Sequence, residues 1–311
     1  MTTKEILSWL FEGDVSIQYQ THRDLLDTDK PSLRKRIEHE GWGVKFLSYR
    51  QPNKHWGRGF YQPKWISTHY TLLDLKNLAI SPDNTVIKET VDIILEKEKG
   101  PDGGIYPVGT DQVTDVCING MVLNFSSYFK VNEEYLKSIV DFLLKEQMPD
   151  GGFNCRSNRS GAVHSSLHTT LSVIEGIQEY RNNGYSYRLD ELKKAQAESD
   201  EFILMHKLFR SDKTGEIINP NFLKLYYPPR WYYDILKAMD YFQSAKVNYD
   251  NRIDDALEII LTKRTKEGQW KLPSKHPGQT HFEMEQAGKP SRWNTLRALR
   301  VLKHFNKDVS I

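Results

Sequence analysis

The stretch Gln147-Met-Pro-Asp-Gly-Gly-Phe153 decides the fold, because versions of it recur along the chain between two helical segments. In each version a polar helix ends, a turn carries Gly and an aromatic or apolar residue, and a second helix opens on a polar or aromatic residue. Recurrence at roughly 50 to 60 residues is typical of repeat proteins. We therefore predict an array of helical hairpins. The turns lie at residues 53–57, 102–105, 150–153, 213–216 and 267–270.

The two helices of each hairpin differ in their pattern of apolar residues. The second helices place apolar residues at three- and four-residue steps on more than one face, so they pack on several sides. The first helices, such as 85–97, 133–147 and 250–262, carry Lys and Glu between their apolar positions. We predict an inner ring of second helices and an outer ring of first helices. The inner helices begin near residues 68, 115, 167, 230 and 292.

The segments 4–11 and 17–26 add a helical pair ahead of the repeats, which makes about six hairpins. We predict one all-α domain over residues 1–311, with the N-terminal helical pair in 1–30 and the hairpin repeats in 31–305. Six hairpins can close into an α/α toroid, which is a double α-barrel of inner and outer helices. An open α-solenoid is the alternative arrangement.

Composition argues against several classes of partner. The 43 basic and 41 acidic residues leave a net charge of +2 without a basic block, so no nucleic-acid partner is expected. No apolar run reaches the length of a membrane span, so no integral membrane segment is expected. The N-terminus lacks the apolar core of a signal peptide, and Cys117 and Cys155 are typical of reduced thiols, so we predict a cytoplasmic location. The protein partner is unknown.

The turn at 147–153, its weaker copy at 99–105 and the variant at 266–270 resemble the repeats of the prenyltransferase and squalene-cyclase superfamily. The stretches 228–234 and 290–297 are similar to bacterial repeat proteins of that type. The resemblance implies an α/α toroid and a terpenoid cyclase/prenyltransferase-like protein. Such a protein would bind an apolar or isoprenoid-like small molecule in a central aromatic cavity. The cyclase acid motif Asp-x-Asp-Asp is absent, so squalene-type cyclisation is not expected.

The same resemblance implies a zinc site. Protein prenyltransferases hold zinc with Asp-x-Cys at one inner-helix start and His at the next, and Asp115, Cys117 and His168 match that spacing. Three mixed ligands with an open fourth position suit a catalytic zinc that activates a thiol or another nucleophile, so Asp115 and His168 are the catalytic candidates. A core cysteine and a capping histidine are the alternative interpretation. His164 is a substitute ligand, and an Asp111–Asp115 acid–base pair would exclude the metal.

Other polar and aromatic residues fall at or beside the predicted inner-helix starts. Their rings would contact an apolar ligand, and their arginines would meet an anionic group. The alternative is that Trp and Tyr only fill space. The predicted substrate-binding residues are His69, Tyr70, Arg230, Trp231, Tyr233, Arg292, Trp293 and His281.

Two further functions stay open. The first is a carbohydrate-active α/α-toroid enzyme, either a glycosidase or a lyase, which would also use walls of Trp and Tyr. A glycosidase needs two carboxylates facing each other, and Asp115 and Asp234 are the main candidates. The second is a non-catalytic ligand-binding or scaffold module. It is favoured if side chains fill the cavity and no metal binds.

Overall fold

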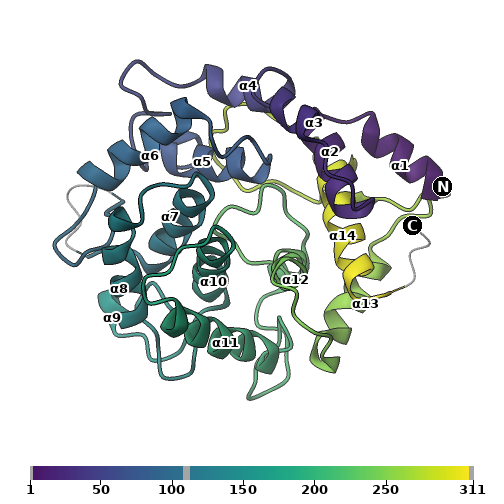
Figure 1. The fold of residues 1–311 in the computed structure, drawn as a ribbon. Coiled ribbons are helices and arrows are strands. Elements are labelled where there is room, and N and C mark those ends of the chain that lie inside the picture. Colours follow the sequence, from purple (N-terminus) through teal and green to yellow (C-terminus); the bar gives the residue numbers. More distant parts are fainter. Residues whose placement is uncertain (1–2, 108–112, 308–311) are drawn as a thin grey trace. The chain divides into compact units, whose positions relative to one another are not determined.

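The computed structural model describes residues 3–107 and 113–307, and their contacts group into two compact units. Unit 1 contains Met1–Tyr49, Asn77–Ser81 and Met205–Ile311, and unit 2 contains Arg50–Lys76 and Pro82–Leu204. The described part of the chain is mainly helical, and its strands are two dipeptides (Figure 1). A single domain over residues 1–311 stays a prediction.

Unit 1 joins the N-terminal helices to the C-terminal hairpins. Helices α12 and α14 pack against each other, and β1 pairs with β2 in antiparallel register. The elements of unit 1 are α1 (Thr3–Phe11), α2 (Val15–Gln20), the π-helix η1 (Thr21–Leu25), α3 (Pro31–Arg36), α4 (Gly41–Ser48), η4 (Pro220–Leu223), α12 (Ile235–Ser244), η5 (Asn251–Ile253), α13 (Asp254–Thr262), β1 (Trp270–Lys271), β2 (Pro290–Ser291) and α14 (Arg292–His304).

Unit 2 holds the middle hairpins, with α7 and α10 side by side at its centre. Helices α5 and α11 belong to this unit apart from their last residues. The elements of unit 2 are η2 (Lys64–Ile66), α5 (Thr68–Asn77), α6 (Thr85–Lys97), α7 (Val116–Tyr128), η3 (Glu133–Tyr135), α8 (Lys137–Lys145), α9 (Ser157–Ser160), α10 (Leu167–Asn182) and α11 (Leu189–Met205).

Most helix starts agree with the predicted hairpins. Helix α6 has the predicted bounds, and α5, α10 and α14 start at the predicted residues. The prediction of an inner-helix start at 230 is wrong. Arg230 has a φ of 56°, which an α-helix does not allow, and the helix begins only at Ile235. Asp234 caps that helix, because its Oδ1 accepts the amide hydrogen of Lys237 at 2.8 Å.

One hydrogen bond explains the recurring turn. In four hairpins the turn residue before the inner helix is fully buried and donates its backbone N–H to a side-chain oxygen on that helix. This bond fixes the turn against its own helix, so the repeated Gly-aromatic pattern encodes a turn geometry. The four pairs are Trp56 to Thr68 at 2.9 Å, Ile105 to Asn119 at 2.8 Å, Phe153 to Thr170 at 2.9 Å and Trp270 to Thr295 at 3.0 Å.

The Pro-Asp-Gly-Gly turns repeat at the atomic level as well. Gly103 and Gly151 both have a φ of 89°, a conformation that side chains disfavour. The preceding aspartates tie the turn to the chain before the inner helix. Asp102 accepts hydrogen bonds from Thr114, and Asp150 accepts the backbone N–H of Ser165 at 2.8 Å and its hydroxyl. These glycines and aspartates therefore have a structural role that any α/α hairpin of this shape requires.

The helices α7 and α10 approach each other closely at two glycines. A Cβ atom on Gly176 would lie 2.3 Å from the carbonyl oxygen of Gly120, and a Cβ on Gly120 would lie 2.7 Å from the carbonyl oxygen of Ser172. Both distances are shorter than van der Waals contact with backbone atoms. The glycines therefore set the separation of the two central helices of unit 2.

We expect Gly176→Ala to lower the free energy of unfolding by about 1 to 3 kcal/mol, because the added methyl group pushes α10 away from α7. Chemical denaturation measures the change, and Lys194→Ala on the exposed face of α11 is the control helix substitution. Helix propensity alone favours alanine over glycine. A Gly176→Ala variant as stable as the parent would therefore disprove the close packing.

Unit 1 contains a buried ionic network around Asp240 on α12. Its carboxylate accepts from Arg300 Nε at 2.5 Å and from Arg297 Nε at 3.2 Å. Arg300 also donates to Asp24 at 2.8 Å, which links α14 to η1. Burial alone would raise the pKa of Asp240, but Arg300 and then Arg297 outweigh burial and hold that pKa below its usual value. The network connects the N-terminal helices with the last hairpin.

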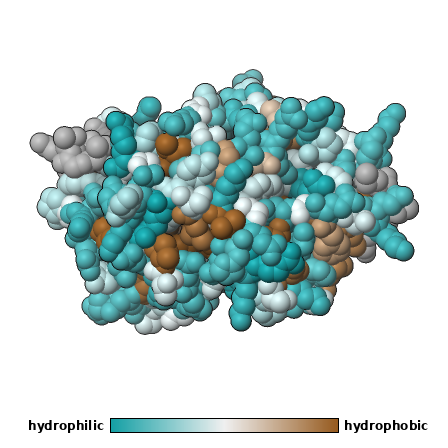
Figure 2. All heavy atoms as spheres, turned by 90° about the horizontal axis from the view of Figure 1, so that it is seen from above, coloured by the Kyte–Doolittle hydropathy of each residue, from teal (hydrophilic) through white to brown (hydrophobic). Residues whose placement is uncertain are grey.

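One face of the protein is largely polar. On the face drawn in Figure 2, hydrophilic side chains predominate, and apolar side chains are exposed only in separate patches. Within residues 3–107 and 113–307, no helix combines the length and the apolar character that crossing a bilayer requires. The cytoplasmic location stays a prediction.

Candidate functional site

A cluster of reactive side chains surrounds the start of α7 in unit 2. Asp115 is the N-cap residue of that helix and Cys117 lies in its first turn. Lys64, from η2, interacts electrostatically with both of them, and Tyr61 interacts with Cys117, Asp115 and Cys155. Lys64 is exposed and the other four residues are half-buried, so the cluster is open to solvent. We call Tyr61, Lys64, Asp115, Cys117 and Cys155 the α7 cluster.

Tyr61 connects the α7 cluster to a buried second layer. Its hydroxyl oxygen lies 3.0 Å from that of Tyr70, which is fully buried. Burial raises the pKa of Tyr61 well above its usual value, and the charges of Cys117 and Asp115 add to that effect, while the bond from Tyr70 opposes it. Tyr61 is therefore a neutral phenol near pH 7, with a proton to donate and a second hydroxyl behind it.

His69 lies in an aromatic cage next to Tyr70. Its ring centroid lies 5.3 Å from that of Tyr61, 5.5 Å from Phe60 and 5.7 Å from Phe125. The side chain is fully buried, and among the described residues neither ring nitrogen has a hydrogen-bond partner. Burial, and then the charge of Lys64, lower the pKa of His69 to about 3. The imidazole is neutral at ordinary pH, and its predicted contact with a ligand stays a prediction.

The depressed pKa makes the stability of the fold depend on pH. Between pH 6.5 and pH 3 the unfolded chain binds a proton at His69 and the folded chain does not, so stability falls as the pH falls. His69→Leu removes the imidazole that binds this proton in the unfolded chain. We expect the parent to lose about 2 kcal/mol more than the variant between pH 7 and pH 5. Urea unfolding at both pH values measures the difference, and parallel losses would refute it.

Cys117 and Cys155 form a pair of free thiols within the α7 cluster. The backbone N–H of Cys117 donates to Cys155 Sγ at 3.1 Å, and the Thr169 hydroxyl on α10 donates to the same sulfur at 3.5 Å. The two thiols also hydrogen-bond with each other. That bond lowers the pKa of the Cys155 thiol although burial opposes it, and the bond and then burial raise the pKa of the Cys117 thiol.

The proposed zinc ligands are not gathered into one group. Among residues 3–107 and 113–307, no three His, Cys, Asp or Glu side chains form a cluster that could hold a metal ion. Cys117 instead pairs with Cys155, while His168 lies in the first turn of the neighbouring helix α10. His164 is exposed, and Asp111 lies outside the described residues. The zinc site and the catalytic roles of Asp115 and His168 stay predictions.

Several predicted binding residues in unit 1 lie inside the protein. Tyr233 is buried and donates its hydroxyl hydrogen to the backbone oxygen of Leu208 at 2.5 Å. Trp293 is 2% exposed and stacks on Tyr227 with ring centroids 4.7 Å apart. Arg292 is only half-buried, and it donates from Nε to the backbone oxygen of Trp9 at 2.9 Å. These placements favour packing roles.

The remaining predicted residues of unit 1 are partly exposed. Trp231 stacks on Tyr232 with centroids 4.0 Å apart, and Tyr232 stacks on His276 at 3.8 Å. His281 stacks on Tyr49 at 4.7 Å, and burial, followed by the charge of Arg230, lowers the pKa of His281 to about 4. Arg230, Trp231 and His281 thus stay candidates for ligand contact.

Two carboxylates of unit 1, Glu285 and the glycosidase candidate Asp234, are helix caps. Glu285 accepts the backbone N–H groups of Arg292 at 2.7 Å and Trp293 at 3.2 Å, at the start of α14. Asp234 caps α12 in the same way, and burial raises its pKa to about 6. Both carboxylates accept hydrogen bonds from backbone N–H groups that have no acceptor within the first turn of their helix. This capping role explains the position of the two carboxylates without a substrate.

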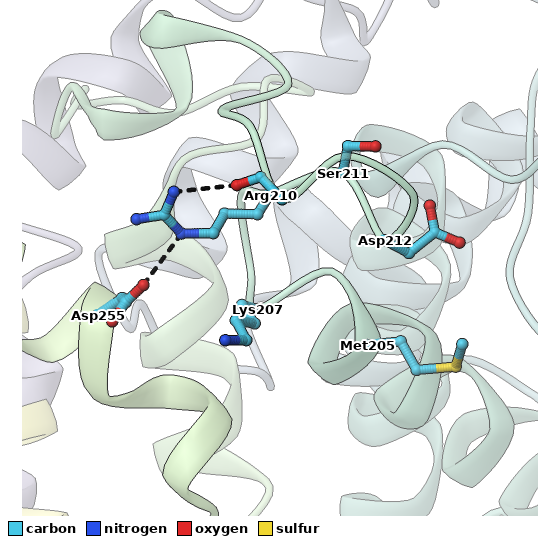
Figure 3. A pocket seen from close by; sticks show the side chains of 7 residues that line it. Met205, Lys207, Arg210, Ser211, Asp212 and Asp255 are labelled. Atoms are coloured by element: carbon cyan, nitrogen blue, oxygen red, sulfur yellow. Dashed lines mark hydrogen bonds and ion pairs between the residues drawn. The ribbon is translucent and has the colours of Figure 1, made fainter.

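A hollow of about 350 Å³ lies in unit 1 beside the end of α11 (Figure 3). Arg210 crosses it, donating to Asp255 at 3.0 Å and to the backbone oxygen of Gly215 at 3.1 Å. None of the predicted site residues lines this hollow. Its lining residues are Met205, Lys207, Arg210, Ser211, Asp212, Gly215 and Asp255.

Comparison with known proteins identifies the architecture. No family model and no curated protein matches the sequence. Among solved structures, a polysaccharide lyase matches with a TM-score of 0.54 and 12% identity, over 97% of this chain and 96% of that chain. The fold is an all-α, α/α-toroid fold. At this level of identity the likeness concerns the fold alone.

The resemblance to the prenyltransferase and squalene-cyclase superfamily is therefore wrong as an assignment. A solved structure that matches 97% of this chain is a polysaccharide lyase, and the terpenoid cyclase/prenyltransferase-like function with its isoprenoid-like ligand is wrong as well. The physical reason lies in the turn. Asp150 and Gly151 serve the turn geometry, and Phe153 serves the turn bond and the core, so the motif reports a hairpin shape rather than a reaction.

Proposed function

We propose that this chain is a carbohydrate-active enzyme that cleaves an acidic polysaccharide by β-elimination. The observation that supports this function best is the likeness to a polysaccharide lyase along 97% of the chain. The α7 cluster adds chemistry of the right kind, because it combines a cation, a neutral phenol and a half-buried, accessible position. Fold likeness by itself would not suffice.

Elimination from a uronic acid makes three demands on a protein. A base removes the proton on the carbon next to the carboxylate, a double bond forms, and the glycosidic oxygen leaves with a proton from an acid. Negative charge builds up on the substrate carboxylate as its neighbouring carbon loses the proton. A fixed cation at that carboxylate lowers the barrier, because it stabilises charge that develops during the reaction.

Three residues of the α7 cluster and His168, from the neighbouring helix α10, divide these roles. Lys64 pairs with the substrate carboxylate, and Asp115 holds the Lys64 ammonium at the start of α7 by charge attraction. Tyr61 gives its proton to the leaving oxygen, and the Tyr70 hydroxyl 3.0 Å away supports that proton transfer. His168, which starts α10 beside Thr169, is our candidate for the base, because a neutral imidazole accepts a proton near pH 7.

The positions of the carboxylates agree better with a lyase than with a glycosidase. A glycosidase requires two carboxyl groups on opposite sides of the scissile bond. Of the two main candidates, Asp234 is fully buried and spends one oxygen on capping α12. Asp115 is half-buried and adjacent to Lys64, which suits an orienting role.

The test is incubation of the purified protein with a panel of polyuronates and of neutral glucans. We expect new ultraviolet absorbance from unsaturated uronate ends with at least one polyuronate and none with the neutral glucans. New reducing ends without that absorbance would indicate hydrolysis and overturn the lyase. No cleavage across the full range of polyuronate linkages would overturn it as well.

A further inference from the structure

We propose that Cys117 and Cys155 are a peroxide-reactive dithiol that closes into a reversible disulfide. The pair is the only cysteine content of the 311-residue chain, so any disulfide within one molecule joins these two residues. Nothing in the polysaccharide chemistry uses either thiol.

The contacts around Cys155 prepare its sulfur for attack. Three donors point at Cys155 Sγ: the backbone N–H of Cys117 at 3.1 Å, the Thr169 hydroxyl at 3.5 Å and the Cys117 thiol. Donors stabilise a thiolate, and a thiolate is the form that reacts with peroxides. The N–H from Cys117 belongs to the first turn of α7, a 13-residue helix whose N-terminal end favours negative charge.

The resolving partner is already in place. The Cys117 thiol hydrogen-bonds with that of Cys155, so the two sulfur atoms need little movement to join. Both residues are half-buried, which leaves a path for a molecule as small as hydrogen peroxide. Lys64 is exposed and its positive charge acts on Cys117, while the charge of Asp115 opposes a thiolate at Cys155. Redox-sensor cysteines are accessible to the oxidant and often stand next to a resolving cysteine.

The reaction balances with a peroxide as the oxidant. The Cys155 thiolate attacks one peroxide oxygen, the O–O bond breaks, and the departing hydroxide takes a proton, which leaves a sulfenic acid and water. The Cys117 sulfur then attacks the Cys155 sulfur, the S–O bond breaks, and the second water leaves. The two thiols have lost two hydrogen atoms in all. A thiol reductant reverses the change by exchange.

Closure would tie the loop around residue 155 to the first turn of α7. Asp115 and Lys64 lie beside that bond, so closure would alter the α7 cluster that we assign to the polysaccharide reaction. This regulatory consequence rests on the proposed function. The disulfide itself does not, because it forms and is measured without any polysaccharide.

The experiment treats the reduced full-length protein with hydrogen peroxide and follows intact mass and thiol alkylation. We expect the loss of two hydrogen atoms, protection of both cysteines from alkylation, and full recovery with a thiol reductant. Cys117→Ser should stop at the sulfenic acid and react with a dimedone probe. Cys155→Ser should keep its remaining thiol at the same dose, and Thr169→Val should slow the parent reaction.

Several outcomes would overturn the dithiol. Both cysteines could stay alkylatable after oxidation, Cys155→Ser could oxidise as fast as Cys117→Ser, or the disulfide could link two molecules on a non-reducing gel. Methionine oxidation adds oxygen that a thiol reductant does not remove, so it is distinguished from the disulfide. Absence of polysaccharide cleavage by the reduced protein, together with normal disulfide closure on oxidation, would count against the proposed function alone.

Discussion

Replacing Asp240 with Ala is expected to lower the free energy of unfolding by about 3 to 5 kcal/mol, because it leaves buried arginines without their counter-charge. The side chain of Arg297 is only 4% exposed and that of Arg300 is 16% exposed. Both lose their ion pair with Asp240, while Arg300 keeps its ion pair with Asp24 and its hydrogen bond to Gln20. Chemical denaturation of the purified variant measures the loss.

The matched control is Asp255→Ala, which also removes an aspartate paired with an arginine in unit 1. The Asp255 side chain is 46% exposed, and its bond to Arg210 is 3.0 Å long. An exposed pair contributes about 0 to 1 kcal/mol, so the control should change little. Equal losses of unfolding free energy in the two variants would contradict this prediction, because burial of the network around Asp240 would then add nothing to stability.

Tyr61→Phe is expected to reduce kcat for polysaccharide cleavage by about 100- to 10,000-fold, because it removes the proposed general acid. The ring and its contacts with His69 and Phe60 remain, so the fold should be kept. Steady-state kinetics on the best polyuronate measures the effect. Lys64→Met should lower kcat as well, by about 100-fold or more, since the developing carboxylate charge loses its cation.

Tyr135→Phe is the control for the tyrosine substitution. Tyr135 lies in η3, away from the α7 cluster, and its hydroxyl donates to Glu96 of α6 at 3.2 Å. Loss of this hydroxyl should leave kcat unchanged. If Tyr61→Phe retained the parental kcat, Tyr61 would not be the acid. A drop in kcat with unchanged circular dichroism and melting temperature would separate a chemical role from a folding defect.

The hairpin architecture was predictable because its signals are local. Helix periodicity, the glycines at 103 and 151 and the aromatic turn residues all act within one repeat. The turn bond from Phe153 to Thr170 joins residues of the same hairpin, and so it leaves a periodic trace in the sequence. The break before α12 escaped prediction, because the left-handed conformation of Arg230 has no residue-type signal.

The site was only partly predictable. Asp115 and Cys117 stood out at an inner-helix start, but Tyr61 and Lys64 reach them from a loop in the preceding hairpin. Periodicity carries no information about which loop side chain meets which helix start. The partner of Cys117 was missed for the same reason, since the contact with Cys155 depends on tertiary packing. The signal available was chemical: the chain has two cysteines, and each follows a repeated turn.

The wrong assignment to the prenyltransferase and squalene-cyclase superfamily has a related cause. The Asp-Gly-Gly-Phe turn satisfies backbone geometry, so proteins that share the hairpin share the motif whatever reaction they catalyse. His69 and Trp293 look like ligand-facing residues in the sequence because they stand at inner-helix starts. In the fold they are 0% and 2% exposed, and they pack against other aromatic rings.

The mass of the cleavage products formed in water enriched in oxygen-18 distinguishes elimination from hydrolysis. A lyase breaks the glycosidic bond without adding water, so neither new chain end from a polyuronate should take up the label, and the new non-reducing end should carry one unsaturated uronate. Hydrolysis would add one oxygen-18 atom for each bond broken, at one of the two new ends, and leave the uronate saturated. Unlabelled, unsaturated products that disappear in Tyr61→Phe are the result we predict, and labelled, saturated products would contradict the proposed function.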